Sequence, residues 1–132
     1  LSLNRLQSAE WHFNLAKKLA ALREQGALII GSGNIVHNLR AISWEHIDQI
    51  GAGYDWAFAF RETVNQAIAT RDDKTLVHYE QLGKKAELSV PTPDHYLPLL
   101  YIMALCEPQD EVTFFNDNLI AGSLSMTSVL VG

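Results

Sequence analysis

Residues 26–34 read GALIIGSGN, in which four consecutive apolar residues lie between two glycines and lead into a glycine-rich turn. A run of this length is too short for a stable helix. Because every residue in it is apolar, the run is typical of a strand that is buried on both faces, as in a parallel sheet. We therefore expect residues 27–30 to form a strand near the centre of the fold.

The sequence before this run predicts a strand and a helix. Residues 1–3 alternate between apolar and polar side chains, as a strand does. Ser8 can then cap a helix that Gly26 would end, and this helix would bury one apolar face. The face consists of Trp11, Leu15, Leu19 and Leu22. Strand, helix and buried strand make a βαβ unit, which predicts an α/β fold with a mainly parallel sheet flanked by helices.

Three further helices are predicted downstream. A helix over residues 55–71 carries an apolar side chain at every fourth position, which gives it one face for the core. A shorter helix over residues 73–82 would end at Gly83. The PTPD turn at residues 91–94 would start another, whose first turn must hold Pro98. The apolar face of the first of these helices consists of Trp56, Phe60, Val64 and Ile68.

The composition of the chain is that of one globular unit. Of its 132 residues, 48% are hydrophobic and 19% are charged, the balance of a soluble domain with a modest core. Strands over residues 111–115 and 123–131 are expected to close the chain, and no repeat or linker interrupts it. We therefore predict a single domain over residues 1–132.

Charge and hydropathy exclude two classes of partner. The net charge is −5 and no stripe of Lys and Arg is present, which argues against a nucleic-acid backbone as a partner. No apolar run approaches the roughly 20 residues that a membrane span needs, so we expect a cytoplasmic protein. Cys106 is the single cysteine, which excludes an internal disulfide and a CxxC motif.

Two of the five histidines stand out by their position. His37 follows the glycine-rich turn, where side chains in an open α/β sheet point toward a ligand. His95 follows the PTPD turn at the start of a helix. Both are candidate metal ligands or proton carriers, although a structural role is at least as common for a single histidine. His12, His46 and His78 lie in surroundings that favour solvation or packing.

Other site chemistries find less support in the sequence. Gly31-Ser32-Gly33 lacks the third glycine of a dinucleotide-binding fingerprint, because position 36 is Val. Asn34 and Asn38 could orient ligands or simply form the turn. A zinc hydrolase is disfavoured, since no activated serine or cysteine and no HExxH motif accompanies the histidines.

Three segments resemble one known family, the 4,5-DOPA extradiol dioxygenases. Residues 26–40, GALIIGSGNIVHNLR, resemble the family signature GxLIxGSGNxVHNLR. Residues 91–101, PTPDHYLPLLY, are similar to its PTPEHYLPLLY segment. Residues 122–128 resemble the GSLSM strand near the family's C-terminus. The similarity covers nearly the whole chain and corresponds to the C-terminal half of the class III extradiol dioxygenase fold.

The resemblance implies a non-haem metal enzyme that opens the ring of catechols such as DOPA with O₂. It implies Fe(II) as the catalytic metal, with Zn(II) found in some members. By this match His37 is a metal ligand, and His95 is either a second ligand or the acid/base. Neutral imidazole suits both metals, and its ordinary pKa near neutrality suits proton transfer.

The chain departs from the family in length. Members run to about twice this chain, and the resemblance implies two further ligand histidines in an N-terminal half, supplied by the same protein or by a second chain. The alternative is a catalytically silent α/β binding or scaffold domain that kept the fold without a full metal site. We expect His37 and His95 to share one cleft at the carboxyl end of the sheet. We also expect an exposed apolar surface or strand edge where the other half docks.

Overall fold

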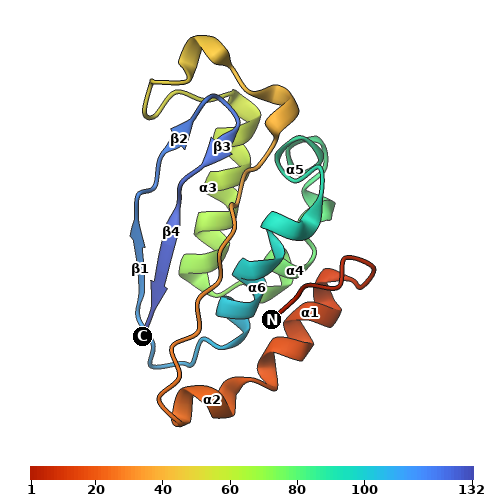
Figure 1. Ribbon diagram of the computed structural model, residues 1–132, viewed down its shortest axis with the longest axis vertical. Coiled ribbons are helices and arrows are strands. Elements are labelled where there is room, and N and C mark those ends of the chain that lie inside the picture. The colour runs from red at the N-terminus through yellow and green to blue at the C-terminus, as the bar shows by residue number, and fades with distance from the viewer.

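The longest helix, α3 (Asp55–Thr70), matches the prediction from its apolar spacing. Phe60, Val64 and Ile68 are fully buried, because residues four apart share one face of a helix. In this computed structural model, which describes residues 1–132, α3 contacts α4 (Asp73–Val77) and α5 (Lys84–Ser89). α3 runs through the middle of the molecule, between the strands and the other helices (Figure 1).

The helix α6 (Leu97–Ala104) begins as the sequence predicts. Pro98 lies in its first turn, where a missing backbone N–H costs nothing. Tyr96 precedes the helix, is fully buried, and donates its hydroxyl hydrogen bond to the Leu76 carbonyl at 3.1 Å. α6 packs along α1 (Ala9–Lys17), and this pair completes the core.

The predicted first helix differs from the structure in extent and in its buried face. Ser8 does cap α1, accepting a hydrogen bond from the Trp11 backbone N–H, but the helix ends early and α2 (Ala20–Glu24) follows. The predicted face is wrong: Trp11 is 41% exposed, whereas Phe13 and His12 are buried. His12 can be buried because its ring is hydrogen-bonded on both sides, to the Tyr101 hydroxyl at 2.9 Å and to the Asn4 carbonyl at 3.0 Å.

Two small antiparallel sheets lie along one side of the helices (Figure 1). β1 (Val112–Phe115) pairs with β4 (Ser128–Val131), and β1 matches the expected strand over residues 111–115. The single strand expected over residues 123–131 is divided into two short strands, which pair in different sheets. β2 (Leu119–Ile120) pairs with β3 (Leu124–Ser125). Short 3₁₀ turns connect the larger elements, at Leu39–Ala41, Trp44–His46, Tyr79–Leu82 and Pro93–His95.

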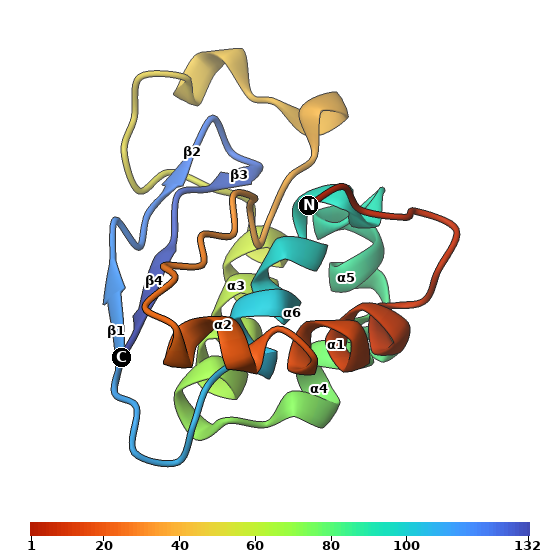
Figure 2. The ribbon, with the colours of Figure 1, turned by 60° about the horizontal axis from the view of Figure 1, so that its bottom comes forward.

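The expected parallel sheet and its βαβ unit are not found in this chain. Residues 27–30 form no strand, although they run beside β4 as Figures 1 and 2 show, and residues 1–3 form none either. Leu28 and Ile30 are 82% and 79% exposed. A parallel strand needs a hydrogen-bonded neighbour in the same sheet, and residues 27–30 pair with no strand of this chain. The fold is therefore mixed α/β and mostly helical, and no helix has the length and apolar composition to cross a bilayer.

Candidate functional site

The rings of His37 and His95 lie face to face. Their centroids are 3.7 Å apart and their planes differ by 18°. His37 comes from the segment after the glycine-rich turn, and His95 is the last residue of the Pro93–His95 turn. The structure thus brings together the two histidines that the sequence singles out. Neither His12, which bonds to Tyr101, nor His46, which bonds to Ser43 at 2.7 Å, joins them.

Backbone hydrogen bonds hold His37 in place. Its N–H donates to the Ser89 carbonyl at 2.8 Å, and it forms an isolated bridge with Leu124 of β3. The next residue, Asn38, is buried, and its side-chain amide donates to the Leu88 carbonyl at 2.7 Å. Asn38 therefore fastens the His37 segment to α5 and is committed to the fold rather than free for a ligand.

The glycine-rich turn holds His95. The Asn34 backbone N–H donates to the His95 carbonyl at 2.8 Å, and a Cβ at Gly33 would collide with that same oxygen. The side chain of Asn34 donates to the Ser125 carbonyl at 2.6 Å. These glycines let two backbone segments approach each other closely, which is the physical reason for their presence. The glycine-rich turn therefore packs directly against the PTPDH turn.

Asp94 is a site residue that the sequence analysis did not single out. Its Oδ2 lies 3.4 Å from Nε2 of His95, and its Oδ1 is buried without a hydrogen-bond partner in the chain. Interaction with the Thr92 side chain lowers the pKa of Asp94, and the His95 and Arg5 charges lower it further. The carboxylate is therefore ionised at neutral pH and lies beside the His95 ring.

Burial lowers the pKa of the His37 imidazole from its ordinary value of 6.5. The charge of a protonated His95 lowers it further, while Asp94 acts in the opposite direction. The His37 imidazole is therefore neutral near pH 7. Neutral imidazole is the form that binds a metal ion.

The histidine pair alone does not make a metal centre. Residues 1–132 contain no group of three or more His, Cys, Asp or Glu arranged to hold a metal ion. The lone pair of an imidazole nitrogen lies in the plane of its ring, so two stacked rings direct their lone pairs side by side and do not converge on one ion. In this orientation the two rings do not coordinate one ion together.

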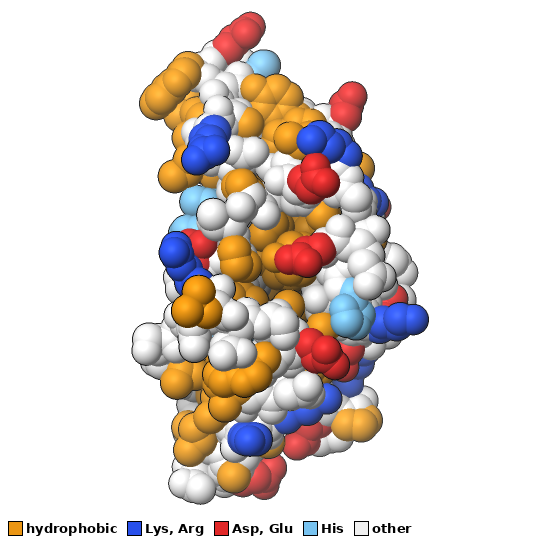
Figure 3. All heavy atoms as spheres, turned by 90° about the vertical axis from the view of Figure 1, so that its right-hand side faces the viewer, with side chains coloured by type: hydrophobic (Ala, Val, Ile, Leu, Met, Phe, Trp, Pro, Cys, Tyr) orange, Lys and Arg blue, Asp and Glu red, His pale blue; other side chains and the backbone are white.

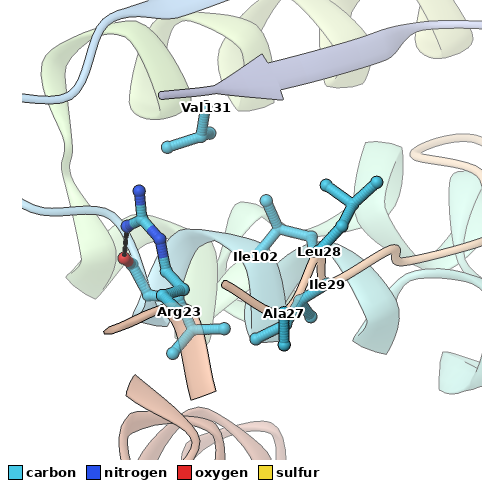
Figure 4. A pocket seen from close by; sticks show the side chains of 7 residues that line it. Arg23, Ala27, Leu28, Ile29, Ile102 and Val131 are labelled. Carbon is cyan, nitrogen blue, oxygen red and sulfur yellow. Dashed lines mark hydrogen bonds between the residues drawn. The ribbon is translucent and has the colours of Figure 1, made fainter. Parts of the chain in front are cut away.

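A groove of about 530 Å³ opens beside His95. One wall is the segment of residues 28–35, and the other includes Phe115 and residues 127–131. A smaller apolar pocket of about 80 Å³ adjoins it, lined by Leu28, Val131 and their neighbours beside Arg23 (Figure 4). His95 lines the groove and His37 does not, although the two rings lie together as expected. The expected carboxyl end of a parallel sheet is absent, because both sheets are antiparallel.

Comparison with known proteins relates the chain to one kind of enzyme. It is 41% identical over 135 residues to the 4,5-DOPA dioxygenase extradiol of Escherichia coli K12, covering 100% of this chain and 48% of the relative. The 4,5-DOPA dioxygenase extradiol of Beta vulgaris is 26% identical over 117 residues, covering 89% of this chain and 42% of that protein. The chain therefore spans about half the length of the curated relatives it matches. No protein-family model matches it.

A solved structure gives the same result. The crystal structure of an uncharacterized protein from Escherichia coli K12 matches with a TM-score of 0.86 and 39% sequence identity. The match covers 97% of this chain and 52% of the other. The arrangement of helices and small sheets described above is thus similar to about half of that larger structure.

Proposed function

We propose, on the premise that this chain is homologous to the 4,5-DOPA extradiol dioxygenases over about half of their length, that it supplies part of a metal-dependent site that opens catechol rings with O₂. The observation that carries the proposal is the contact between His37 and His95. The two motifs that resemble the family meet at these rings, although they are far apart in the sequence.

His37 and His95 have different proposed roles. His37 is the proposed metal ligand, the role that the family resemblance implies, and its lowered pKa is consistent with an imidazole that stays neutral and able to coordinate. His95 is the acid/base, because its ring is stacked on His37 and Asp94 lies beside its Nε2. In this role His95 takes a proton from a catechol hydroxyl and returns it later, while the Asp94 carboxylate stabilises the imidazolium. A bound non-haem Fe(II) would supply the chemistry that activates O₂, and Zn(II) fits the same donor type.

The remaining ligands must come from outside residues 1–132. One or two imidazoles hold a metal weakly against water, whereas three in a fixed geometry chelate it and leave positions for catecholate and O₂. The proposed source is the other half of the enzyme, in the same protein or in a second chain. That half would also cover the open groove beside His95 and exclude bulk water from the reaction.

One rival has an observation in its favour. A silent binding or scaffold domain would keep the fold without a metal site, and this chain has no three-residue metal set of its own. The two proposals differ in what happens when the missing half is supplied. The dioxygenase gains a metal and activity, and the silent domain gains neither.

The test is turnover in a reconstituted enzyme. The 132-residue chain is mixed with the segment of the Escherichia coli relative that lies outside the match, loaded with Fe(II) without air, and given DOPA and then O₂. We expect the yellow ring-opened product from the mixture and none from the chain alone. His37→Ala should abolish turnover and His95→Ala should reduce it strongly, by about 100-fold or more for a lost acid/base. His78→Ala, a half-buried histidine outside the pair, is the matched control.

Two results would contradict the proposal. Turnover by the 132-residue chain alone would show that nothing is missing from the site. A reconstituted enzyme that keeps full activity with His37→Ala would show that the ligand is a different residue. A stable complex without metal or activity would favour the silent domain.

A further inference from the structure

Residues 28–33 present an unused strand edge. They belong to no helix or strand, and none of their backbone N–H or C=O groups takes part in a backbone–backbone hydrogen bond. Six consecutive residues without such a bond are unusual in a folded domain, in which most backbone groups are paired. The groups are accessible, because five of these six residues are exposed and only Ile29 is half-buried.

The segment is nevertheless fixed in position. Before it, the Ala27 N–H donates to the Leu22 carbonyl at 3.0 Å, and after it the Asn34 N–H donates to the His95 carbonyl at 2.8 Å. In its middle, Gly31 lies so close to α6 that a Cβ would come within 2.8 Å of the Pro98 carbonyl oxygen. A segment held at both ends and against a helix keeps its free edge in place for a partner.

The side chains of the segment also lack a covering layer. Leu28 and Ile29 border the small apolar pocket together with Ile102 of α6 (Figure 4), but Leu28 and Ile30 remain 82% and 79% exposed. Burying each of these two side chains would contribute roughly 1.5–3 kcal/mol. An apolar run that is half-buried on one face and bare on the other is typical of a strand whose sheet is incomplete.

The opposite wall of the groove offers a second free edge. Glu111 and Gly132 exchange both of their backbone hydrogen bonds, at 3.3 and 3.2 Å. Because hydrogen-bonded and non-hydrogen-bonded pairs alternate in an antiparallel ladder, Val129 and Val131 turn their N–H and C=O groups away from β1. β4 and the segment of residues 28–33 lie side by side in Figures 1 and 2, and both line the groove.

A second apolar surface differs from the groove in its backbone hydrogen bonds. The loop of residues 39–54, at the top of Figures 1 and 3, exposes Trp44 and Ile50 among its apolar side chains. Its backbone, however, is tied to the chain: the Ser43 N–H donates to Ala121 and the Gly51 N–H to Leu119. The loop is therefore apolar without a free edge, and the groove is the surface that can add a strand.

We propose that the groove beside His95 is a strand-addition site, in which an extended apolar segment pairs its backbone with residues 28–33 and covers Leu28 and Ile30. The occupant to which we assign it is a strand from the half of the dioxygenase that lies outside this chain. This assignment rests on the proposed function and on the shares of 48% and 52% that the chain covers of its relatives. The added strand would continue the sheet toward the histidine pair and bring the missing half to the site.

The test is amide hydrogen exchange on the 132-residue chain, alone and mixed with the unmatched segment of the Escherichia coli relative. In the chain alone, the amides of residues 28–33 should exchange rapidly. In the mixture they should slow by about 100-fold or more, because ladder hydrogen bonds form. The amides of residues 44–50 in the exposed loop are the internal control and should change little.

Two variants separate backbone pairing from apolar contact. Leu28→Pro with Ile30→Pro removes two N–H groups that bond to nothing in the chain, so the isolated chain should keep its stability. The double variant should weaken binding by about 100-fold or more, since it blocks the ladder. Leu28→Ala with Ile30→Ala keeps both N–H groups and should weaken binding less. Equal binding by the proline variant and the unaltered chain would overturn strand addition.

The other outcomes are also decisive. Protection confined to residues outside 28–33, or no binding at all, would overturn the proposal. Protection of residues 28–33 in the chain alone at high concentration, with a doubled mass, would show that a second copy occupies the groove and would overturn the assigned occupant. If residues 28–33 become protected but DOPA is not turned over, strand addition stands and the proposed function fails. If DOPA is turned over without protection of residues 28–33, the proposed function stands and strand addition fails.

Discussion

The helical core and the segment of residues 28–33 differ in where their partners lie. Phe60 of α3 and Leu100 of α6 are fully buried by residues of this chain, whereas Leu28 and Ile30 are almost as exposed as they would be in an unfolded chain. Both regions are strongly apolar in sequence. The difference shows that an apolar pattern predicts burial, but that the chain itself has to contain the covering partner for the burial to occur.

The largest difference between the two regions should appear on truncation of a leucine. Leu100→Ala removes a fully buried side chain, so we expect it to lower the free energy of unfolding by about 2–5 kcal/mol. Leu28→Ala removes an exposed one and should change it by less than about 0.5 kcal/mol. Urea unfolding of both variants measures the contrast. Similar losses would mean that Leu28 is packed in solution rather than exposed.

Gly33→Ala should be the most damaging change within the exposed segment. The added methyl group collides with the His95 carbonyl oxygen, and an overpacked contact of this kind costs about 1–3 kcal/mol. The collision should also separate the rings of His37 and His95, which NMR ring-proton shifts would detect. Gly51→Ala has open space around it and is the control; its cost, from a φ of +85°, should leave the histidine shifts unchanged.

His12→Leu tests a polar contact within the core. The substitution leaves the buried Tyr101 hydroxyl and the Asn4 carbonyl without their partner, which should cost about 1–3 kcal/mol although leucine is more apolar. Thermal unfolding measures the loss. An unchanged or higher midpoint would show that water reaches these groups and that the hydrogen bonds of His12 contribute little.

The smallest expected effect is a pH dependence of the free energy of unfolding, which arises from the ion pair between Arg23 and Asp110. The hydrogen bond from Arg23 lowers the pKa of Asp110 from 3.8 to about 2. A lowered pKa in the folded state stabilises the fold above pH 3.8, and this contribution is lost as the pH falls toward about 2. Asp110→Asn should therefore be less stable at neutral pH, and the gap to the unaltered chain should narrow in acid. If the free energies of unfolding of the two proteins differed by the same amount at every pH, the ion pair between Arg23 and Asp110 would contribute no pH-dependent stability.

Local signals in the sequence predict the local parts of the structure. The bounds of α3, the Ser8 cap and the place of Pro98 follow from spacing and capping chemistry, which depend on neighbours along the chain. The sequence also singles out His37 and His95, which the structure brings into contact, while their chemical roles stay predictions.

The remaining features depend on partners that no local pattern reveals. The strand predicted over residues 27–30 is wrong for this chain, because its ladder has no partner within residues 1–132. Asp94 gives no signal in the sequence, because an acidic residue in a turn is common and only the fold shows that its carboxylate lies beside His95. The predicted face of α1 is wrong because a histidine with two hydrogen bonds can replace an apolar residue there.

The most direct test of the half-site is metal retention rather than activity. The chain alone, the reconstituted complex and the complex with His37→Ala are each loaded with Fe(II) without air, passed through a desalting column and assayed for bound metal. We expect about one Fe(II) per reconstituted complex and almost none in the chain alone or with His37→Ala, because fewer than three protein ligands cannot hold the ion. Retention of Fe(II) by the chain alone, or by the complex with His37→Ala, would contradict a metal site that is shared between His37 and residues outside this chain.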